Sequence, residues 1–182
     1  MSEAFIALQP DSIFDRVGME EGMQVADLGC GRSGTLTFAA ARRVGPHGLV
    51  YAVDVVPDVL EHMSGRIRSG GHDNIQVIWS DIEVVGKTAV PGNSLDRCFI
   101  QNVLSTLKAE DQALEEAIRL LRPGGILVIV DWQKPLGPGT AIPSRIVTPE
   151  HIERHAERLG FAPQERFSLG GYHYGYTLTK NN

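Results

Sequence analysis

Short apolar runs alternate with helix-like segments from residue 24 to residue 130. Strands are predicted over 24–28, 49–53, 75–79, 95–101 and 126–130. Between the strands, apolar residues recur at helical spacing, and the predicted helices end at Gly45-Pro46, at Gly70-Gly71 and, after a helix over 109–121, before Pro123. This alternation is typical of βα units that build a mostly parallel sheet with helices on both faces.

The two ends of the chain follow other patterns. Residues 134–143 are rich in Pro and Gly, a helix is predicted to begin near Thr148, and β-like segments on either side of 170–171 predict a hairpin. A short helix is predicted over 10–17. We expect a single domain over 1–182, in which residues 1–20 form an arm that covers the ligand-binding edge of the sheet.

The composition agrees with a folded domain, because 42% of the residues are hydrophobic and 21% are charged. A net charge of -5 argues against broad affinity for phosphate backbones, so nucleic acid is not expected as a partner. Cys30 and Cys98 form no disulfide framework and are expected to be reduced thiols. No leader pattern opens the chain and no apolar run could span a bilayer, which predicts a cytoplasmic location.

Two features at predicted strand ends point to a nucleoside. A glycine-rich turn over 29–34 follows the first strand, where backbone amides can approach a ligand closely. Asp54 ends the second strand, about 20 residues further on, where a carboxylate can accept hydrogen bonds from both ribose hydroxyls. The alternatives are a plain tight turn for the glycines and a helix N-terminal charge for Asp54.

The remaining motifs distinguish a nicotinamide dinucleotide from other nucleoside cofactors. The first motif is VADLGCG at 25–31, with an acid two residues before the first glycine, where dinucleotide-binding turns usually have an apolar residue. Three later segments, at 44–54, 74–82 and 119–127, follow in family order. The chain resembles the class I S-adenosylmethionine-dependent methyltransferases, and from residue 94 to residue 131 chiefly the ubiquinone/menaquinone-biosynthesis-like (type 11) group. The resemblance implies a Rossmann-like, doubly wound, mostly parallel seven-stranded sheet with a C-terminal antiparallel hairpin and helices on both faces.

The resemblance also implies the residues that bind S-adenosylmethionine. Asp27 and the turn backbone would hold the methionine portion, Asp54 the ribose, Val55 and Ile82 the adenine ring, and Asp81 the adenine amino group, while Gln101 would run beneath the transferable methyl. The expected cofactor-binding set is Asp27, Gly29, Cys30, Gly31, Asp54, Val55, Asp81, Ile82 and Gln101. The turn departs from the family pattern, because Ser33 stands where a third glycine is usual and the glycine follows at Gly34.

Catalysis in such a site depends on placing the acceptor in line with the methyl, and a general base is needed only when the acceptor has a high pKa. Candidates near the acceptor are Asn102 and His173, with Trp132 as a possible pocket wall and Arg145 as a partner for an anionic acceptor. Structural roles are the alternative for each. No metal ligands are expected, because Gln101 and Asn102 replace the carboxylates of the magnesium-dependent relatives.

We therefore predict methyl transfer to a small-molecule acceptor that the sequence does not identify. One alternative is a non-catalytic protein of the same fold, which binds the cofactor or serves as a partner subunit. A nicotinamide-dependent oxidoreductase is the other, but the catalytic Tyr/Lys or His arrangement that it needs is not found. A homodimer mate or a partner protein could complete so short a chain.

Overall fold

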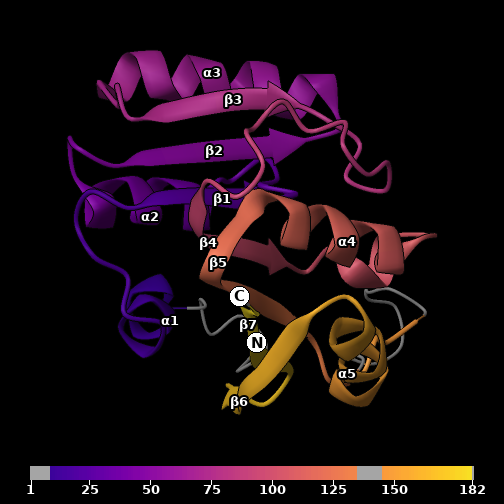
Figure 1. The fold of residues 1–182 in the computed structure, drawn as a ribbon. Coiled ribbons are helices and arrows are strands. Elements are labelled where there is room, and N and C mark those ends of the chain that lie inside the picture. The colour runs from indigo at the N-terminus through magenta and orange to yellow at the C-terminus, as the bar shows by residue number, and fades with distance from the viewer. Residues whose placement is uncertain (1–8, 135–144, 182) are drawn as a thin grey trace.

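The computed structural model describes residues 9–134 and 145–181. Its centre is a seven-stranded sheet in the order β3-β2-β1-β4-β5-β7-β6 (Figure 1). The strands are β1 Gln24–Leu28, β2 Leu49–Asp54, β3 Ile75–Trp79, β4 Leu95–Gln101, β5 Leu121–Trp132, β6 Phe161–Leu169 and β7 His173–Lys180. Strands β1 to β5 pair in parallel, whereas β7 is antiparallel to both β5 and β6. The predicted mostly parallel sheet with a C-terminal hairpin is confirmed.

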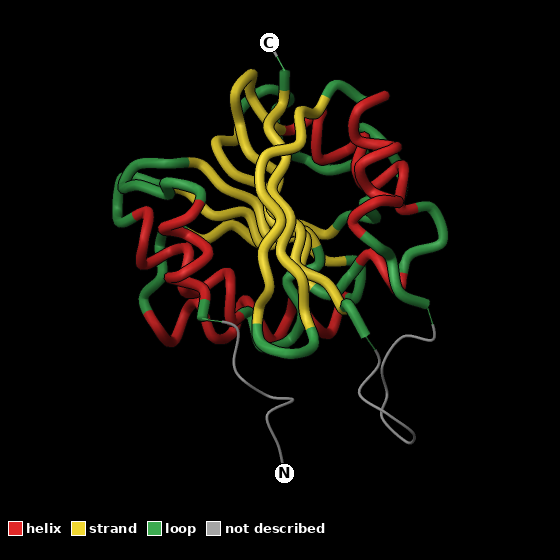
Figure 2. The backbone as a smooth tube through the Cα atoms, turned by 90° about the horizontal axis from the view of Figure 1, so that it is seen from below, coloured by secondary structure: helices red, strands yellow, loops and turns green. Residues whose placement is uncertain are grey.

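Helices cover both faces of this sheet, as Figure 2 shows. They are α1 Pro10–Arg16, α2 Thr35–Val44, α3 Pro57–Gly70, α4 Glu110–Leu120 and α5 Pro149–Arg158, with a short 3-10 helix η2 at Leu104–Thr106. Helices α1, α2 and α3 share one hydrophobic core with the sheet. Helices α4 and α5 share the other, on the opposite face. The sheet is therefore buried on both sides, which explains its nearly continuous apolar strands.

The order of the strands determines where a ligand can bind. From β1 the chain moves outward to β2 and β3, and it then returns to place β4 on the other side of β1. The connections after β1 and after β4 therefore leave in opposite directions, and a crevice opens at the carboxyl ends of these two strands.

Strand β5 differs from the prediction, because it begins at Leu121 rather than near 126. Leu121 pairs with Leu95, and the next pair is Arg97 with Ile126, so four residues bulge out of the ladder between them. Gly124, with φ +73°, turns the bulge, and Leu121 is fully buried. Burial of this leucine returns the chain to the sheet before the glycines, which the local turn signal at 122–125 did not indicate.

Helix α1 confirms the short helix predicted near the N-terminus. Phe14 packs edge-on against Phe99 of β4, with ring centroids 5.6 Å apart, and Arg97 donates to the carbonyl of Val17 at 2.7 Å. These contacts fix α1 on a face of the sheet, where it does not line the cleft described below. Residues 1–8 lie outside the described residues, so an arm over the ligand-binding edge stays a prediction. No described helix is long and apolar enough to cross a membrane.

Candidate functional site

A cleft of about 470 Å³ opens at the crevice between β1 and β4. Its walls come from the segments that follow β1, β2, β3 and β4. The lining residues are Gly29, Cys30, Gly31, Ser33, Asp54, Val55, Val56, Ser80, Asp81, Ile82, Glu83, Gln101, Asn102, Val103, Thr106 and Leu107. Eight of the nine predicted cofactor-binding residues are in this set; Asp27 is not. The volume is within the range of about 300–1,000 Å³ that small-molecule sites usually have.

The glycine turn is shaped by close packing. The amides of Gly29 and Cys30 both donate to the carbonyl of Val53, at 2.8 and 3.0 Å, which ties the turn to the end of β2. Gly29 has φ +82°, and a Cβ there would lie 2.4 Å from Cγ2 of Val103. The turn therefore requires glycine at this position on both conformational and steric grounds.

The displaced third glycine also has a steric explanation. Gly34 is the N-cap of α2 in the left-handed conformation, and a Cβ there would lie 2.4 Å from Cε of Met63. Ser33, which precedes it, lies on the cleft wall, and its carbonyl accepts a hydrogen bond from Arg66 on α3. The altered turn thus keeps glycine where α3 packs against it and places a hydroxyl-bearing residue at the cleft.

Asp54 has a fixed orientation at the centre of the cleft. Its Oδ2 accepts from the amide of Gly31 at 3.0 Å, and its Oδ1 accepts from the amide of Val56 at 3.0 Å. Each carboxylate oxygen can accept a second hydrogen bond. The half-buried carboxylate therefore presents two oriented acceptor positions to a ligand diol.

Asp27 lies beneath the turn rather than on the cleft wall. It is only 2% exposed, and its Oδ2 accepts a hydrogen bond from the hydroxyl of Thr37 at 2.6 Å. Burial raises the pKa of this carboxyl from 3.8 to about 6; the Thr37 hydrogen bond opposes the rise and the charge of Asp54 adds to it. Asp27 thus places a negative charge under the turn, at a cost in folding free energy.

The two cysteines are free, as expected from the sequence. Both are buried, and burial raises the pKa of each thiol well above its ordinary value. Cys30 lines the cleft in spite of this burial, whereas Cys98 lies in the hydrophobic core under α4. Both thiols are therefore protonated and unreactive at neutral pH.

The far end of the cleft follows β2 and β3. Asp81 turns its own loop, because its Oδ1 accepts from the amide of Glu83 at 3.0 Å, and Ile82 is buried beside it. Val55 is 49% exposed, and its carbonyl accepts from the indole Nε1 of Trp79 at 2.9 Å. A planar ring with polar edges could pack against the exposed apolar side chain of Val55 and form hydrogen bonds with the polar groups of the Asp81 loop.

The near end follows β4. Asn102 has φ +56°, its amide donates to the carbonyl of Val130 at 2.8 Å, and its side-chain Oδ1 is buried without a hydrogen-bond partner among the described residues. A non-glycine residue in the left-handed region, with an unsatisfied polar atom beside a cleft, is typical of a functional position. Thr106 and Leu107 complete this wall.

The structure does not bring His173 to the cleft. It begins β7 opposite Trp132, with the two ring centroids 4.0 Å apart, and it is 8% exposed. Burial lowers the pKa of its imidazole, so the ring is neutral at pH 7. Arg145 is engaged elsewhere, because its guanidinium binds both carboxylate oxygens of Glu110, at 3.0 and 2.9 Å. His173 and Arg145 were expected near the acceptor, but they contact Trp132 and Glu110 instead, and the sequence did not indicate these partners.

Ser33 was singled out from the sequence, but several other cleft residues were missed by sequence reasoning, namely Val56, Ser80, Glu83, Val103, Thr106 and Leu107. All of them lie within a few residues of a turn or strand end that was recognised, and that proximity was the available signal. No metal ligands were expected from the sequence, but the structure brings together three side chains that could bind a metal, Asp111, His151 and His155, away from the cleft. The spacing of two histidines four residues apart on a helix was the signal.

Comparison with known proteins agrees with this architecture. A family described as a methyltransferase domain matches residues 19–160. The ubiquinone/menaquinone biosynthesis C-methyltransferase UbiE of Hahella chejuensis is 34% identical over 125 residues, which are 68% of this chain and 49% of that protein. That of Bordetella avium is 32% identical over 126 residues, 68% of this chain and 47% of that protein. The chain thus spans about half the length of the curated relatives it matches.

Solved structures give the same result. A SAM-dependent methyltransferase from Aquifex aeolicus superposes with a TM-score of 0.83 at 25% identity, covering 94% of this chain and 89% of that one. The [4+2]-cyclase SpnF superposes with a TM-score of 0.79 at 17% identity, covering 94% of this chain and 80% of that one, and shares the fold. On the family match, the ordered motifs and the strand order together, this chain belongs to the methyltransferase domain family, as its class I motifs indicated.

Proposed function

We propose that this chain binds S-adenosylmethionine in the cleft between β1 and β4 and transfers its methyl group to a small-molecule acceptor. The observation that carries the proposal is Asp54, whose two carboxylate oxygens are oriented into the cleft by the amides of Gly31 and Val56. Family membership and the position of the cleft at the switch point of the sheet support it.

The residues of the cleft fit this cofactor in kind and in order. Asp54 would accept hydrogen bonds from the ribose hydroxyls, the exposed side chain of Val55 would flank the adenine, and Asp81 with the Ile82 amide would meet the edge of that ring. Asp27 lies beneath the turn, and its buried carboxylate would attract the ammonium group of the methionine portion. When bound, the cofactor supplies an electrophilic methyl group on a positively charged sulfur.

The protein's own contribution is placement and exclusion of water. We propose that Gln101 lies beneath the methyl and that Asn102, on the wall of the cleft, holds the acceptor. Its buried Oδ1 lacks a partner among the described residues, and rotation of the side-chain amide would let this oxygen accept a hydrogen bond from an acceptor N–H or O–H. His173 does not line the cleft, so we do not propose it as the base. The matching relatives are named C-methyltransferases, so small molecules with a nucleophilic carbon are the acceptors to screen first.

We also propose a cytoplasmic location and a second copy or a partner protein beside the cleft. Large apolar side chains are exposed there, at Val55, Val56, Trp79, Val84 and Val85. Light scattering of the purified chain, with and without the cofactor, tests self-association directly.

The cofactor site is tested by calorimetric titration with S-adenosylmethionine and, separately, with NAD. We expect micromolar binding of the sulfonium cofactor alone, and Asp54→Ala should weaken it about 100-fold, since two hydrogen bonds to a charged group are worth about 3 kcal/mol together. Asp58→Ala is the matched control, because Asp58 is an exposed aspartate on α3 outside the cleft lining. Circular dichroism confirms that each variant is folded.

The other outcomes separate the alternatives. Binding of NAD, or of neither ligand, would refute the proposed cofactor. Tight binding of S-adenosylmethionine without S-adenosylhomocysteine formation across the acceptor screen would identify a non-catalytic binder. Loss of product formation in Asn102→Ala, with cofactor affinity retained, would place that side chain at the acceptor.

A further inference from the structure

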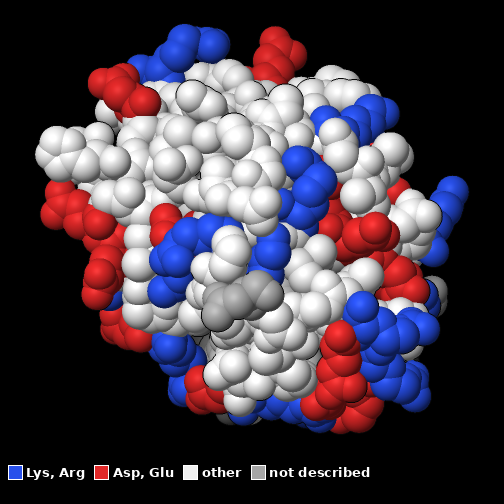
Figure 3. All heavy atoms as spheres, viewed as in Figure 1, with Lys and Arg blue, Asp and Glu red and all other residues white. Residues whose placement is uncertain are grey.

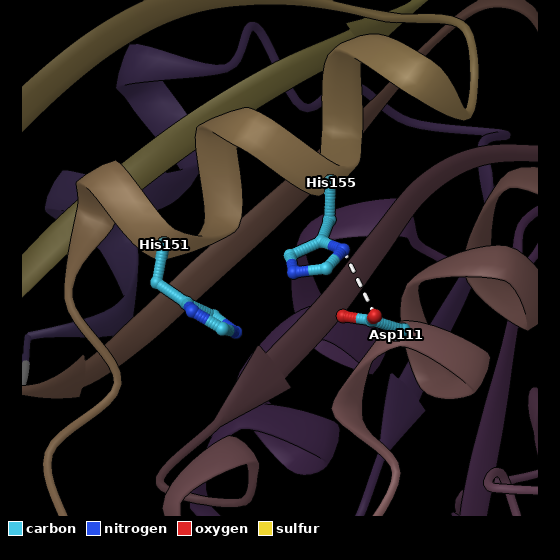
Figure 4. A group of neighbouring side chains, drawn as sticks. All are labelled: Asp111, His151 and His155. Carbon is cyan, nitrogen blue, oxygen red and sulfur yellow. Dashed lines mark ion pairs between the residues drawn. The ribbon is translucent and has the colours of Figure 1, made fainter.

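A cluster of metal-ligating side chains joins α4 to α5, on the opposite face of the sheet from α2 and α3. His151 and His155 lie one turn apart on α5, with ring centroids 4.7 Å apart, and Asp111 lies in the first turn of α4. Figure 4 shows both imidazoles and the carboxylate converging from the two helices. Two histidines at i and i+4 on a helix, opposite a carboxylate, form a common ligand set for transition metals.

The distances are close to those of a metal site. Oδ2 of Asp111 is 2.8 Å from Nδ1 of His155, and one ligand atom from each of the three residues lies within 4.8 Å of the others. Ligand atoms on one tetrahedral zinc ion are about 3.3 Å apart, given bond lengths of about 2.0–2.1 Å. Side-chain rotation can close the difference, because the Asp111 side chain is 52% exposed and that of His151 35%.

A second observation concerns His151. Its Nε2 is buried and makes no hydrogen bond with the described residues, although Oε1 of Glu110 is 3.1 Å away. A carboxylate at this distance can orient the His151 ring as an outer-shell partner, while the other ring nitrogen binds the ion.

We propose that Asp111, His151 and His155 bind a first-row divalent transition-metal ion such as Zn²⁺, which ties α5 to the start of α4. Imidazole ligands favour zinc, nickel and copper, whereas Mg²⁺ and Ca²⁺ prefer an all-oxygen set. Three protein ligands leave a fourth position for water. The site is separate from the proposed cofactor cleft, so it does not depend on the proposed function.

One neighbouring group opposes the metal. The guanidinium of Arg158, an exposed residue that ends α5, contacts Nδ1 of His155 and must move when that nitrogen binds a cation. Acidic and basic side chains lie close together in this region of the surface (Figure 3). The acidic residues Glu150 and Glu153 of α5 both pair with Arg166. Replacing Arg158 by glutamine should therefore tighten metal binding.

The test is calorimetric titration of the tag-free, metal-stripped full chain with ZnCl₂ and, separately, with MgCl₂. We expect one Zn²⁺ per chain, little response to Mg²⁺, and a higher Tm with zinc. His151→Gln and His155→Gln should each weaken zinc binding at least about 100-fold, since losing a direct ligand exceeds the 10–100-fold cost of losing an outer-shell partner. Arg158→Gln should strengthen it several-fold. His62→Gln, an exposed histidine on α3, is the matched control.

The Tm of each variant in EDTA shows whether it folds as the parent does, which separates loss of a ligand from loss of structure. The absorption spectrum of the Co²⁺-loaded chain gives an independent readout, because tetrahedral nitrogen and oxygen coordination has a distinct visible band. Absence of saturable zinc binding, or equal binding in a His151→Gln/His155→Gln double variant, would overturn the proposal. So would loss of binding in His62→Gln.

Discussion

The buried carboxylate of Asp27 gives a prediction in which stability and binding change in opposite directions. The native state holds the Asp27 proton more tightly than the unfolded chain does, because burial raises its pKa from 3.8 to about 6. The contribution of this group to stability is therefore complete below about pH 4 and is lost as the pH rises through 6. At pH 7 the buried carboxylate is ionised and its charge destabilises the fold.

The size of the effect follows from the shift. Each pKa unit corresponds to 1.36 kcal/mol, so a rise of about two units makes the ionised Asp27 cost about 3 kcal/mol. Asparagine has the same shape as the protonated carboxyl, and its amide oxygen can still accept the hydrogen bond from Thr37. Asp27→Asn should therefore raise the free energy of unfolding by up to about 3 kcal/mol at pH 7 and by less than about 1 kcal/mol at pH 4.

Urea denaturation of both proteins at half-unit steps from pH 4 to pH 7.5 measures this difference. Glu61→Gln, an exposed carboxylate-to-amide replacement in the interior of α3, should shift stability by less than about 0.5 kcal/mol at every pH. If the stability of Asp27→Asn and that of the parent fall in parallel across this window, Asp27 does not titrate near 6 and the reasoning is wrong.

The same variant should bind S-adenosylmethionine more weakly, because it lacks the negative charge under the turn that would attract the ammonium group of the methionine portion. A carboxylate that costs stability and contributes affinity is a familiar feature of functional sites. Calorimetric titration of Asp27→Asn with S-adenosylmethionine at pH 7.5 measures this loss of affinity. Unchanged affinity would mean that Asp27 only shapes the turn.

Three further outcomes are expected. Gly29→Ala should lower the free energy of unfolding by about 2 kcal/mol, because the new side chain would have a left-handed φ and would clash with Val103. Adding Val103→Ala to this variant should restore part of the lost stability, as measured by urea denaturation. Glu116→Gln should cost about 3 kcal/mol at pH 7, because it removes the fully buried carboxylate that pairs with Arg119 and accepts from the amides of Gly86 and Thr88. Its pKa is lowered to about 2, against burial, chiefly by that hydrogen-bonded pair, so the gap to the parent should narrow as the pH falls from 4.5 towards 2. Cys30 and Cys98 should resist alkylation at pH 7.5 until urea unfolds the chain, and rapid labelling of the native protein would contradict their burial.

The sequence by itself determined the features that depend on neighbouring residues. Short apolar runs predicted the strands, helical spacing predicted the helices, and Gly and Pro predicted most helix ends, because each of these signals lies within or next to a single element. The glycine turn and Asp54 at the end of β2 indicated the nucleoside end of the site for a similar reason. Parallel strands bring their carboxyl ends to one edge, so these residues had to lie together once the sheet was parallel.

Only the tertiary structure decided the features that depend on distant segments. Burial of Asp27 requires α2 to pack over it, and the early start of β5 requires Leu121 to meet Leu95 across the sheet. Asp111 and His151 are 40 residues apart, and Arg145 meets Glu110 across a similar separation. Contacts of this kind have no local period to reveal them, because their free energy comes from packing between elements that the sequence places far apart.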